Sequence, residues 1–484
     1  MEEYSLRFQI NNIGAIENAD VEIDGITIIA GENNVGKSTI GKALYAFLHD
    51  MYSWEKIYNE TCSSRLEKFL YQNSSLLDDW CMKVSGAKRR RTNKVNQLIK
   101  QYANNEEFRV SIEDYQLADD EQSQNEAHNN LRYQLGEYCY AYLFLYAKDK
   151  AEDIWGAEEF GWVYDWIINT MSLVKKIELD EITIQISKIK QSLNEVFKGQ
   201  YRKIGTERSK ISFCDDIGRT VNCSIDDKNM LIDVPVRMIN RVFFIESPKL
   251  YDYLSDTSYG HVQKDYLRFL MAPNAFNRNR FSFMRTMKVS SVVEEISNES
   301  LKDITNRLVK TMGGRADFLQ KIGLEFKDDG ISEPIHAVNV STGLKSLALL
   351  EYALRIGAIE DGDILILDEP EINLHPDWQV EYARTLVELQ KYFNLKIIIT
   401  SHSPYFMRAI ECFTDVNDTM DRLNVYRVSE DKKNKRHLIE NVSYSEYGMT
   451  DLYDDLSAPL EELEKLLEEK YGGDNISTDD ESIG

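Results

Sequence analysis

Three features are scarce in this sequence of 484 residues: paired cysteines, long hydrophobic runs and positive charge. No two of the six cysteines form a C-x-x-C pair, so the sequence indicates neither a zinc site nor a disulfide framework. This cysteine usage fits a reducing cytosol. The six are Cys62, Cys81, Cys139, Cys214, Cys223 and Cys412.

No apolar run is long enough to suggest a membrane protein. The longest, residues 138–147, is far shorter than the roughly 20 residues that a spanning helix needs, and it is rich in tyrosine. The first residues also lack the basic and then apolar pattern of a signal sequence. We therefore expect a cytoplasmic protein with no membrane partner.

Positive charge is in deficit, since 57 Lys and Arg face 81 Asp and Glu and give a formal net charge of −24. This balance argues against constitutive coating of nucleic acid, which clustered cations drive. One dense basic run stands clear of acids, Lys88–Arg91 followed by Lys94 and Lys100. It could contact nucleic acid locally, or it could be a solvated helix or loop edge. The tyrosine-rich residues 138–146 are predicted as packed core in preference to a base-stacking platform.

The sequence does contain a complete phosphate-binding loop, G-x-x-x-x-G-K-[ST], at residues 31–38. A β-branched run at 26–30 predicts a buried strand before it, and apolar spacing over 39–48 predicts an amphipathic helix after it. In such a loop the backbone N–H groups and the helix N-terminus bind phosphates. Lys37 would reach the β- and γ-phosphates of ATP, and the Ser38 hydroxyl would bind Mg²⁺. The predicted nucleotide-binding residues of the loop are Gly31, Asn33, Asn34, Gly36, Lys37, Ser38 and Thr39.

A second nucleotide signature is an apolar strand that ends in two carboxylates, Asp368 and Glu369, as in a Walker B motif. We expect this strand to leave the sheet beside the phosphate-binding loop. Asp368 would hold Mg²⁺, and Glu369 would act as the general base that orients and deprotonates the attacking water.

Two weaker signals gain meaning from their order along the chain. His402 follows the strand after Walker B, where it could reach the γ-phosphate. The segment 340–346 would by itself be only a helix start capped by Ser341 or Thr342. It precedes Walker B, however, and contains a Ser-x-Gly motif.

Taken together, the order of these motifs resembles the ABC-type ATPases, in the branch of RecF, the structural-maintenance-of-chromosomes (SMC) proteins and the overcoming-lysogenization-defect (OLD) nucleases. Residues 368–376 and 400–404 look most like OLD-type ATPase domains, including those of bacterial anti-phage systems. The resemblance implies an α/β fold: an ABC-type head with a mixed or parallel sheet flanked by helices, and a large helical insertion. It covers about a third of the chain.

The same resemblance implies a homodimer or higher oligomer that closes head to tail around two ATPs. Ser341, Gly343 and Lys345 of one copy would then face the nucleotide of the other, and residues 371–375 would form a D-loop at the interface. Glu246 and Ser247 lie near the expected Q-loop, although the family's glutamine is not found there. The chain shows no Toprim-like carboxylate set and no long coiled coil, features of the OLD nucleases and of the SMC proteins.

Along the chain, we expect a hairpin of residues 4–10 and 19–23, and a C-terminal helix over 460–470 that starts near Ser457 and Pro459. The predicted organisation has six parts: head with phosphate-binding loop, 1–50; helical insertion that could dock a partner, 51–199; β-segment of the head, 200–248; helical subdomain, 249–323; head with signature, Walker B and His402, 324–450; acidic helix and tail, 451–484.

The functional hypothesis is an ATPase that hydrolyses ATP with Mg²⁺ and regulates a separately encoded effector, a nuclease or toxin, in anti-phage defence. Two alternatives remain. One is a RecF-like repair ATPase that binds DNA in its ATP-bound dimer, and the other is a scaffold that binds ATP with little turnover.

Overall fold

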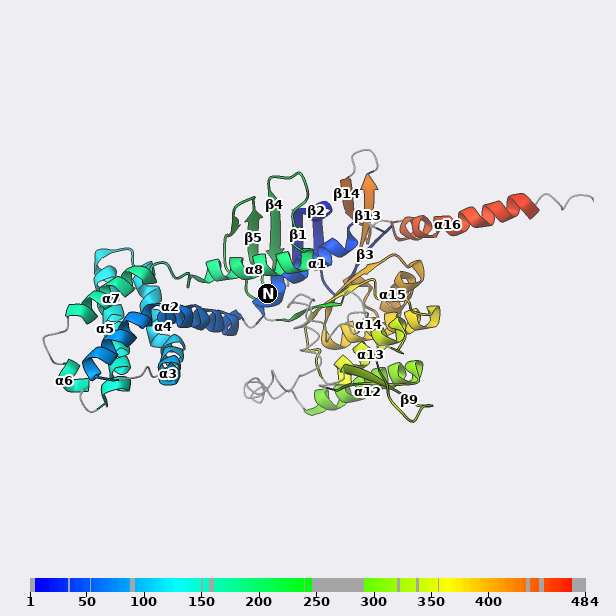
Figure 1. The fold of residues 1–484 in the computed structure, drawn as a ribbon. Coiled ribbons are helices and arrows are strands. Elements are labelled where there is room, and N and C mark those ends of the chain that lie inside the picture. Colours follow the sequence, from blue (N-terminus) through cyan, green and yellow to red (C-terminus); the bar gives the residue numbers. More distant parts are fainter. Residues whose placement is uncertain are drawn as a thin grey trace, which may run out of the picture. The chain divides into compact units, whose positions relative to one another are not determined.

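The computed structural model describes residues 5–33, 35–52, 54–87, 92–148, 151–155, 161–238, 240–245, 291–319, 323–336, 339–355, 357–431, 436–443 and 448–471. The chain divides into two compact units, Met1–Tyr52 with Ile189–Gly484, and Ser53–Lys188. The first is an α/β unit and the second is helical, so the predicted α/β class with a large helical insertion is confirmed (Figure 1).

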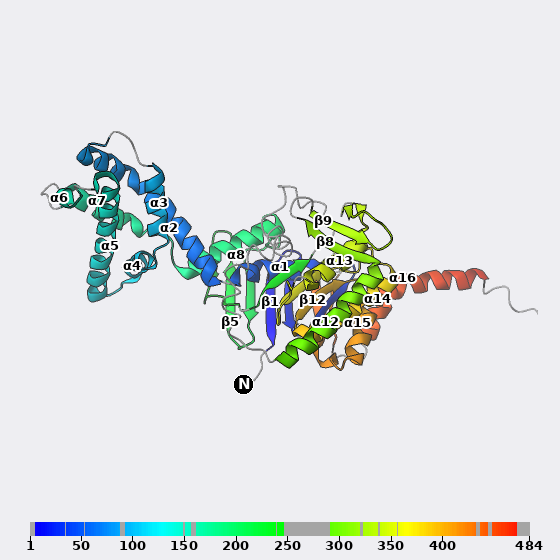
Figure 2. The ribbon, with the colours of Figure 1, turned by 90° about the horizontal axis from the view of Figure 1, so that it is seen from below.

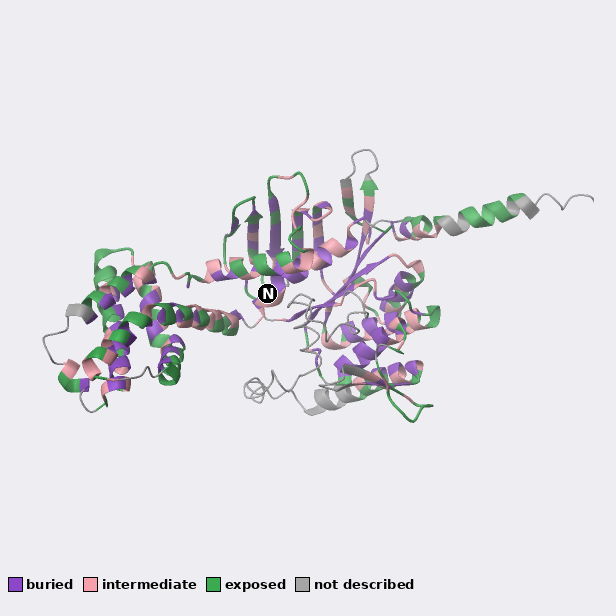
Figure 3. Ribbon diagram, viewed as in Figure 1, coloured by how far each residue is buried: buried purple, intermediate pink, exposed green. Residues whose placement is uncertain are grey.

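A six-stranded sheet organises the α/β unit, in the order β14-β13-β3-β12-β11-β7. All neighbours are parallel except β13 and β14, which form an antiparallel hairpin. The strands are β3 (Ile26–Gly31), β7 (Val242–Ile245), β11 (Ile364–Asp368), β12 (Lys396–Ser401), β13 (Leu423–Asp431) and β14 (Arg436–Asn441). Parallel strands covered on both faces are apolar throughout, and all six residues of β3 are buried (Figure 3).

A second sheet is antiparallel, in the order β2-β1-β4-β5-β6. Its strands are β1 (Leu6–Ile13), β2 (Ile16–Ile23), β4 (Ser209–Cys214), β5 (Thr220–Ile225) and β6 (Met230–Ile232). β1 alternates buried and exposed residues, as expected of a strand with one solvated face. The hairpin predicted at the N-terminus is β1 and β2.

Helix α1 (Lys37–Leu48) packs between the two sheets, which explains why it is buried nearly all round. The Phe47 ring lies 6.5 Å from that of Phe8 in the antiparallel sheet, and the Tyr45 ring stacks 5.6 Å from that of Phe244 in β7. A Cβ on Gly41 would lie only 2.8 Å from Ile366 of β11, so glycine permits this close approach.

The opposite face of the six-stranded sheet carries α13 (Thr342–Arg355), α14 (Pro376–Phe393) and α15 (Pro404–Val416), as Figures 1 and 2 show. Leu365 and Leu367 of β11 join their core, whereas Ile366 faces α1, as the period of two requires. The remaining elements of this unit are η1 (His49–Met51), α12 (Ser291–Met312), β8 (Gly314–Leu319), β9 (Gly323–Asp328), β10 (Ile335–His336), η7 (Met420–Arg422) and α16 (Gly448–Tyr471).

The helical unit contains α2 (Trp54–Ser85), α3 (Thr92–Ala103), α4 (Glu106–Leu117), α5 (Glu121–Ala147), α6 (Ala151–Trp155), α7 (Gly161–Val174) and the first part of α8 (Glu181–Phe197). The tyrosine-rich stretch of α5 lies in its core, as predicted: Tyr138 and Tyr142 are fully buried, and the Tyr138 hydroxyl lies 2.6 Å from that of Ser74.

The start of the last helix differs from the sequence prediction. The C-terminal helix begins at Gly448, not near Ser457, because its first turns pack Leu452 and Leu456 on the core.

All six cysteines are free thiols. None of the described helices is long and apolar enough to span a membrane. The possible Q-loop residues Glu246 and Ser247 and the basic run Lys88–Arg91 lie outside the described residues.

Candidate functional site

The phosphate-binding loop connects β3 to α1 at the carboxyl edge of the parallel strands. A Cβ at Gly31 would lie 2.3 Å from the Val428 carbonyl oxygen of β13, so only glycine fits there. Gly36, the residue before α1, has a φ of 95°, a conformation that side chains rarely adopt. Asn33 is exposed, whereas Asn34 lies outside the described residues.

Lys37 is the buried cation of this loop, with 4% of its surface exposed. Its Nζ donates to the carbonyl oxygens of Gly31 and Glu32 at 2.8 Å each, and it lies 3.6 Å from Oε1 of Glu369. Burial lowers the pKa of Lys37, while the nearby Glu369 carboxylate opposes that shift. The fold therefore brings the Lys37 ammonium group next to the carboxylate of Glu369, the candidate general base.

The two Walker B carboxylates are held by a residue that is missing from the predicted site. Thr400 of β12 is paired in register with Asp368. Its Oγ1 donates to Asp368 Oδ1 at 2.5 Å and accepts from the Glu369 backbone N–H at 3.0 Å. Thr400 could have been found from the sequence, because it is a polar residue directly after the apolar residues Ile397–Ile399.

The Walker B strand β11 ends beside the phosphate-binding loop, as expected. It does not pair with the loop strand β3, because β12 lies between them. The ends of the three parallel strands still meet at one edge, so Glu369 reaches Lys37 across β12. Glu369 itself has a φ of 49°, which is uncommon for a residue other than glycine.

His402 follows β12 and faces the same carboxylates. Its Nδ1 lies 3.5 Å from Glu369 Oε1 and 3.9 Å from Glu371 Oε1, and this buried nitrogen has no hydrogen-bond partner in the described structure. Glu371, which is 3% exposed, accepts from Ser401 Oγ at 2.6 Å and from the His402 N–H at 3.3 Å. Burial raises the pKa of Glu371. Glu371 thus anchors the backbone that carries His402, a role that the sequence prediction missed.

These side chains border an open cavity of about 580 Å³. It is lined by Asn33, Glu369, Glu371, Ile372, Asn373, Leu374, Gln379, His402, Ser403 and Pro404. A polar cavity of this size beside a phosphate-binding loop leaves room for a reacting phosphate and a water molecule.

The Ser-x-Gly segment forms the start of α13, as predicted. Ser341 is exposed, and its Oγ accepts from the Leu344 N–H at 3.4 Å. Gly343 packs on the loop after β11, where a Cβ would lie 2.3 Å from the Asn373 carbonyl oxygen. Lys345 is only 2% exposed, so its ammonium group lies inside its own chain.

The predicted D-loop is also divided between interior and surface. Glu371 and Leu374 are buried, whereas Ile372, Asn373 and His375 are exposed. Within one copy, the Ser-x-Gly segment packs on this loop through a close approach of Gly343 to the Asn373 carbonyl.

The residues present fit a Mg²⁺ ion that relies on phosphates for part of its coordination. Ser38 and Asp368 are both half-buried, and they offer one hydroxyl and one carboxylate. Over the described ranges, no group of three His, Cys, Asp or Glu side chains forms a metal site by itself. Mg²⁺ commonly binds one or two carboxylates together with substrate phosphates.

Thr39, the last of the predicted nucleotide-binding residues of the loop, lies at the start of α1 with its Cγ2 against Gly14.

Comparison with known proteins gives a match to one family model, described as AAA ATPase domain, over residues 7–407. UvrABC system protein A of Treponema pallidum (strain Nichols) is 28% identical over 134 residues, 28% of this chain and 12% of that protein. The same protein of Borreliella burgdorferi is 27% identical over 136 residues, 28% of this chain and 13% of that protein. The match spans about an eighth of the length of these relatives.

Among solved structures, an SMC head bound to the C-winged helix domain of ScpA aligns with 91% of this chain and 98% of that chain, at a TM-score of 0.42 and 10% identity. The SMC head domain from Thermotoga maritima aligns with 91% of this chain and 99% of that chain, at a TM-score of 0.33 and 11% identity.

Proposed function

The chain belongs to the AAA ATPase domain family, and from this premise we propose that it is a Mg²⁺-dependent, OLD-like ATPase that acts as a head-to-tail dimer. We further propose that it regulates a separately encoded effector, a nuclease or toxin, in bacterial anti-phage defence. The convergence of Lys37, Glu369 and His402 at one sheet edge carries the proposal for ATP hydrolysis.

In this proposal the three side chains divide the work of hydrolysis. Lys37 leaves the Gly31 and Glu32 carbonyls and binds the β- and γ-phosphates of ATP, because a phosphate is a stronger acceptor for its charge. Glu369 accepts a hydrogen bond from the attacking water and takes its proton. His402 donates to the γ-phosphate, and Glu371 fixes its backbone. Mg²⁺ held by Asp368 and Ser38 would neutralise charge on the phosphates.

The proposed dimer uses the start of α13. Ser341 is exposed there, and the first turn of a helix directs N–H groups and a positive dipole end outward. These groups, with Gly343, would face the γ-phosphate bound by the other copy. Lys345 would contribute only by a change of side-chain position, since it is buried in its own chain.

ATP binding is tested with Lys37→Ala. We expect affinity for ATP to fall roughly tenfold to a hundredfold, as for loss of hydrogen bonds to a charged group. Calorimetric titration with a non-hydrolysable ATP analogue measures it, and Lys42→Ala on the same helix is the matched control. An unchanged affinity for the analogue in Lys37→Ala would contradict the assignment of the loop.

The effector proposal depends on the OLD-like resemblance, and copurification from the native operon tests it. We expect a stoichiometric partner with nuclease or toxin activity, identified by mass spectrometry, while the ATPase by itself has neither activity. A lone dimer that captures DNA only with ATP would instead support the RecF-like alternative. ATP that stays bound without release of phosphate would support the scaffold.

A further inference from the structure

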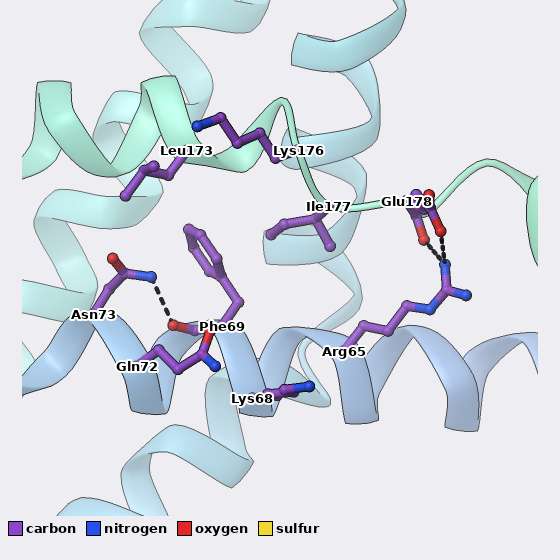
Figure 4. A pocket seen from close by; sticks show the side chains of 9 residues that line it. All are labelled: Arg65, Lys68, Phe69, Gln72, Asn73, Leu173, Lys176, Ile177 and Glu178. Carbon is purple, nitrogen blue, oxygen red and sulfur yellow. Dashed lines mark hydrogen bonds and ion pairs between the residues drawn. The ribbon is translucent and has the colours of Figure 1, made fainter.

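The helical unit has a pocket of about 490 Å³ that the proposed ATPase mechanism does not use (Figure 4). It lies between α2 and the chain that runs from the end of α7 to Glu178. Its lining residues are Arg65, Lys68, Phe69, Gln72, Asn73, Leu173, Lys176, Ile177 and Glu178. We name this the α2–α7 pocket.

The α2–α7 pocket is apolar inside and basic at its rim. Phe69, Leu173 and Ile177 supply the apolar surface, and three cations face one acid. The acid is already occupied, because Arg65 binds the Glu178 backbone carbonyl and lies 3.7 Å from its carboxylate. Such a rim is unusual in a chain with a net charge of −24.

Two of the cations are available for a ligand. Lys68 and Lys176 are exposed, and within the described structure neither side chain has a hydrogen bond or an ion pair. The pocket offers separate ammonium groups and no helix N-terminus, since α7 meets it with its carboxyl end. Spaced carboxylates on a peptide therefore suit it better than a compact phosphate, which helix N-termini favour.

The chain itself carries a segment of the complementary kind in the last turns of α16. Leu463, Leu466 and Leu467 lie on one helical face and are 58%, 57% and 56% exposed. Glu462, Glu464 and Glu469 flank them, also exposed, and none has an ion-pair partner among the residues described. We name residues 462–469 the acidic tip.

The leucine face of the acidic tip continues a buried stripe. In the first turns of α16, Leu452 is 1% exposed and Leu456 packs against the same core cluster. Helical spacing extends this stripe from position 456 to position 463 and beyond. A stripe that is covered by core at one end and left open at the other indicates a second surface that covers the open end.

We propose that the acidic tip of a second copy of this chain docks in the α2–α7 pocket. The leucines lie on Phe69, Leu173 and Ile177, while the glutamates pair with Lys68 and Lys176. This is the mode of an amphipathic helix in a groove. The contact does not use the ATP site, so its failure in a test leaves the proposed ATPase function untouched.

Charge reversal tests the proposal on the full-length protein by sedimentation velocity, in EDTA, without nucleotide and at low salt. We expect the wild type to self-associate with rising concentration. Lys68→Glu with Lys176→Glu should weaken this association at least tenfold, and so should Glu462→Lys with Glu469→Lys. All four substitutions in one chain should restore it, because the charges match again.

Two further variants test the contact. Leu463→Ser with Leu466→Ser should also abolish association, and these exposed positions leave the core intact. The matched control, Lys83→Glu with Lys100→Glu, removes exposed lysines of this unit that lie outside the pocket and should leave association unchanged. A wild type that stays monomeric, an equal loss in the control, or no restoration in the fourfold variant would each overturn the proposal.

A labelled synthetic peptide of residues 455–471 separates the possible sources of the occupant. If the wild type binds this peptide but does not self-associate, the pocket accepts an acidic helix of another protein and the second copy is excluded.

Discussion

Two buried carboxylates, one in each unit, are held in opposite ways. In the helical unit, Asp78 is 7% exposed, and its Oδ1 accepts hydrogen bonds from the hydroxyls of Tyr142 and Tyr146. In the α/β unit, Glu371 is 3% exposed, and its Oε2 has no hydrogen-bond partner in the described structure. Nδ1 of the neighbouring His402 is also buried without one.

We interpret the contrast as one between a polar group that stabilises a core and a polar group that serves the candidate site. Buried polar atoms nearly always find partners, so two unpartnered atoms that lie side by side at the candidate site call for an explanation. The Asp78 network closes on side chains of its own unit. The groups around Glu371 border the cavity beside the phosphate-binding loop, so their unused capacity lies where substrate would bind.

The contrast is sharpened most by Glu369→Gln. This change keeps the shape of the side chain and removes its basicity, so we expect kcat for ATP to fall about 10²-fold to 10⁴-fold. Release of phosphate at saturating ATP measures the loss. Binding of the ATP analogue should persist.

Glu360→Gln, in the turn that precedes β11, is the matched control for this change and should retain activity. If Glu369→Gln hydrolyses ATP at the wild-type rate, then Glu369 is not the base. The polar groups around it in the α/β unit would then have no demonstrated part in hydrolysis.

Asp78→Ala tests the buried carboxylate of the helical unit. It leaves the Tyr142 and Tyr146 hydroxyls without their acceptor, and we expect the helical unit to lose about 2 kcal/mol in its free energy of unfolding. Five of the six tryptophans lie within residues 53–188, so intrinsic fluorescence during urea unfolding reports on this unit.

The rate of ATP hydrolysis by Asp78→Ala should stay within about twofold of wild type, because this carboxylate serves packing alone. Asp79→Ala, at the exposed neighbouring position, is the control and should change stability little. A large loss of hydrolysis with intact folding would show that the helical unit takes part in the reaction.

The sequence predicted the parts of the site that depend on local motifs. Lys37 belongs to a recognisable phosphate-binding loop, and Glu369 and His402 each follow an apolar strand. Parallel strands end at the same edge of a sheet, so these residues come together there. The contacts between Lys37, Glu369 and His402 follow from that geometry. The apolar strands and the N-terminal hairpin were predictable for the same reason, because periodicity is local.

Features that depend on tertiary packing were not predictable in this way. The position of β12 between β3 and β11 is a property of topology, not of any motif. The burial of Lys345 and Glu371 depends on how α13 and the loop after β11 pack together. Likewise α16 begins early because Leu452 and Leu456 meet the core, which Ser457 and Pro459 could not indicate.

The smallest expected effect tests the unmet capacity of Glu371 through pH. Burial raises the pKa of Glu371, so the folded state binds its proton more tightly than the unfolded state does. This group therefore favours folding at pH values below its unfolded pKa, and the contribution is lost as pH rises through the folded pKa. Glu371→Gln removes the charge while a carbonyl oxygen still accepts from Ser401 and His402. We expect the variant to be more stable than wild type by about 1 kcal/mol at pH 8, with the difference vanishing toward pH 4.5.

Denaturant unfolding of the α/β unit, followed by circular dichroism from pH 4.5 to pH 8, measures this difference. The same pair of proteins in a His402→Asn background separates the effect of Glu371 from protonation of the neighbouring imidazole. A glutamine variant that is less stable at every pH would show that Ser401 and His402 already satisfy the carboxylate. The α/β unit would then bury Glu371 for packing, as the helical unit does with Asp78, and the unpartnered oxygen of Glu371 would have no role toward a substrate.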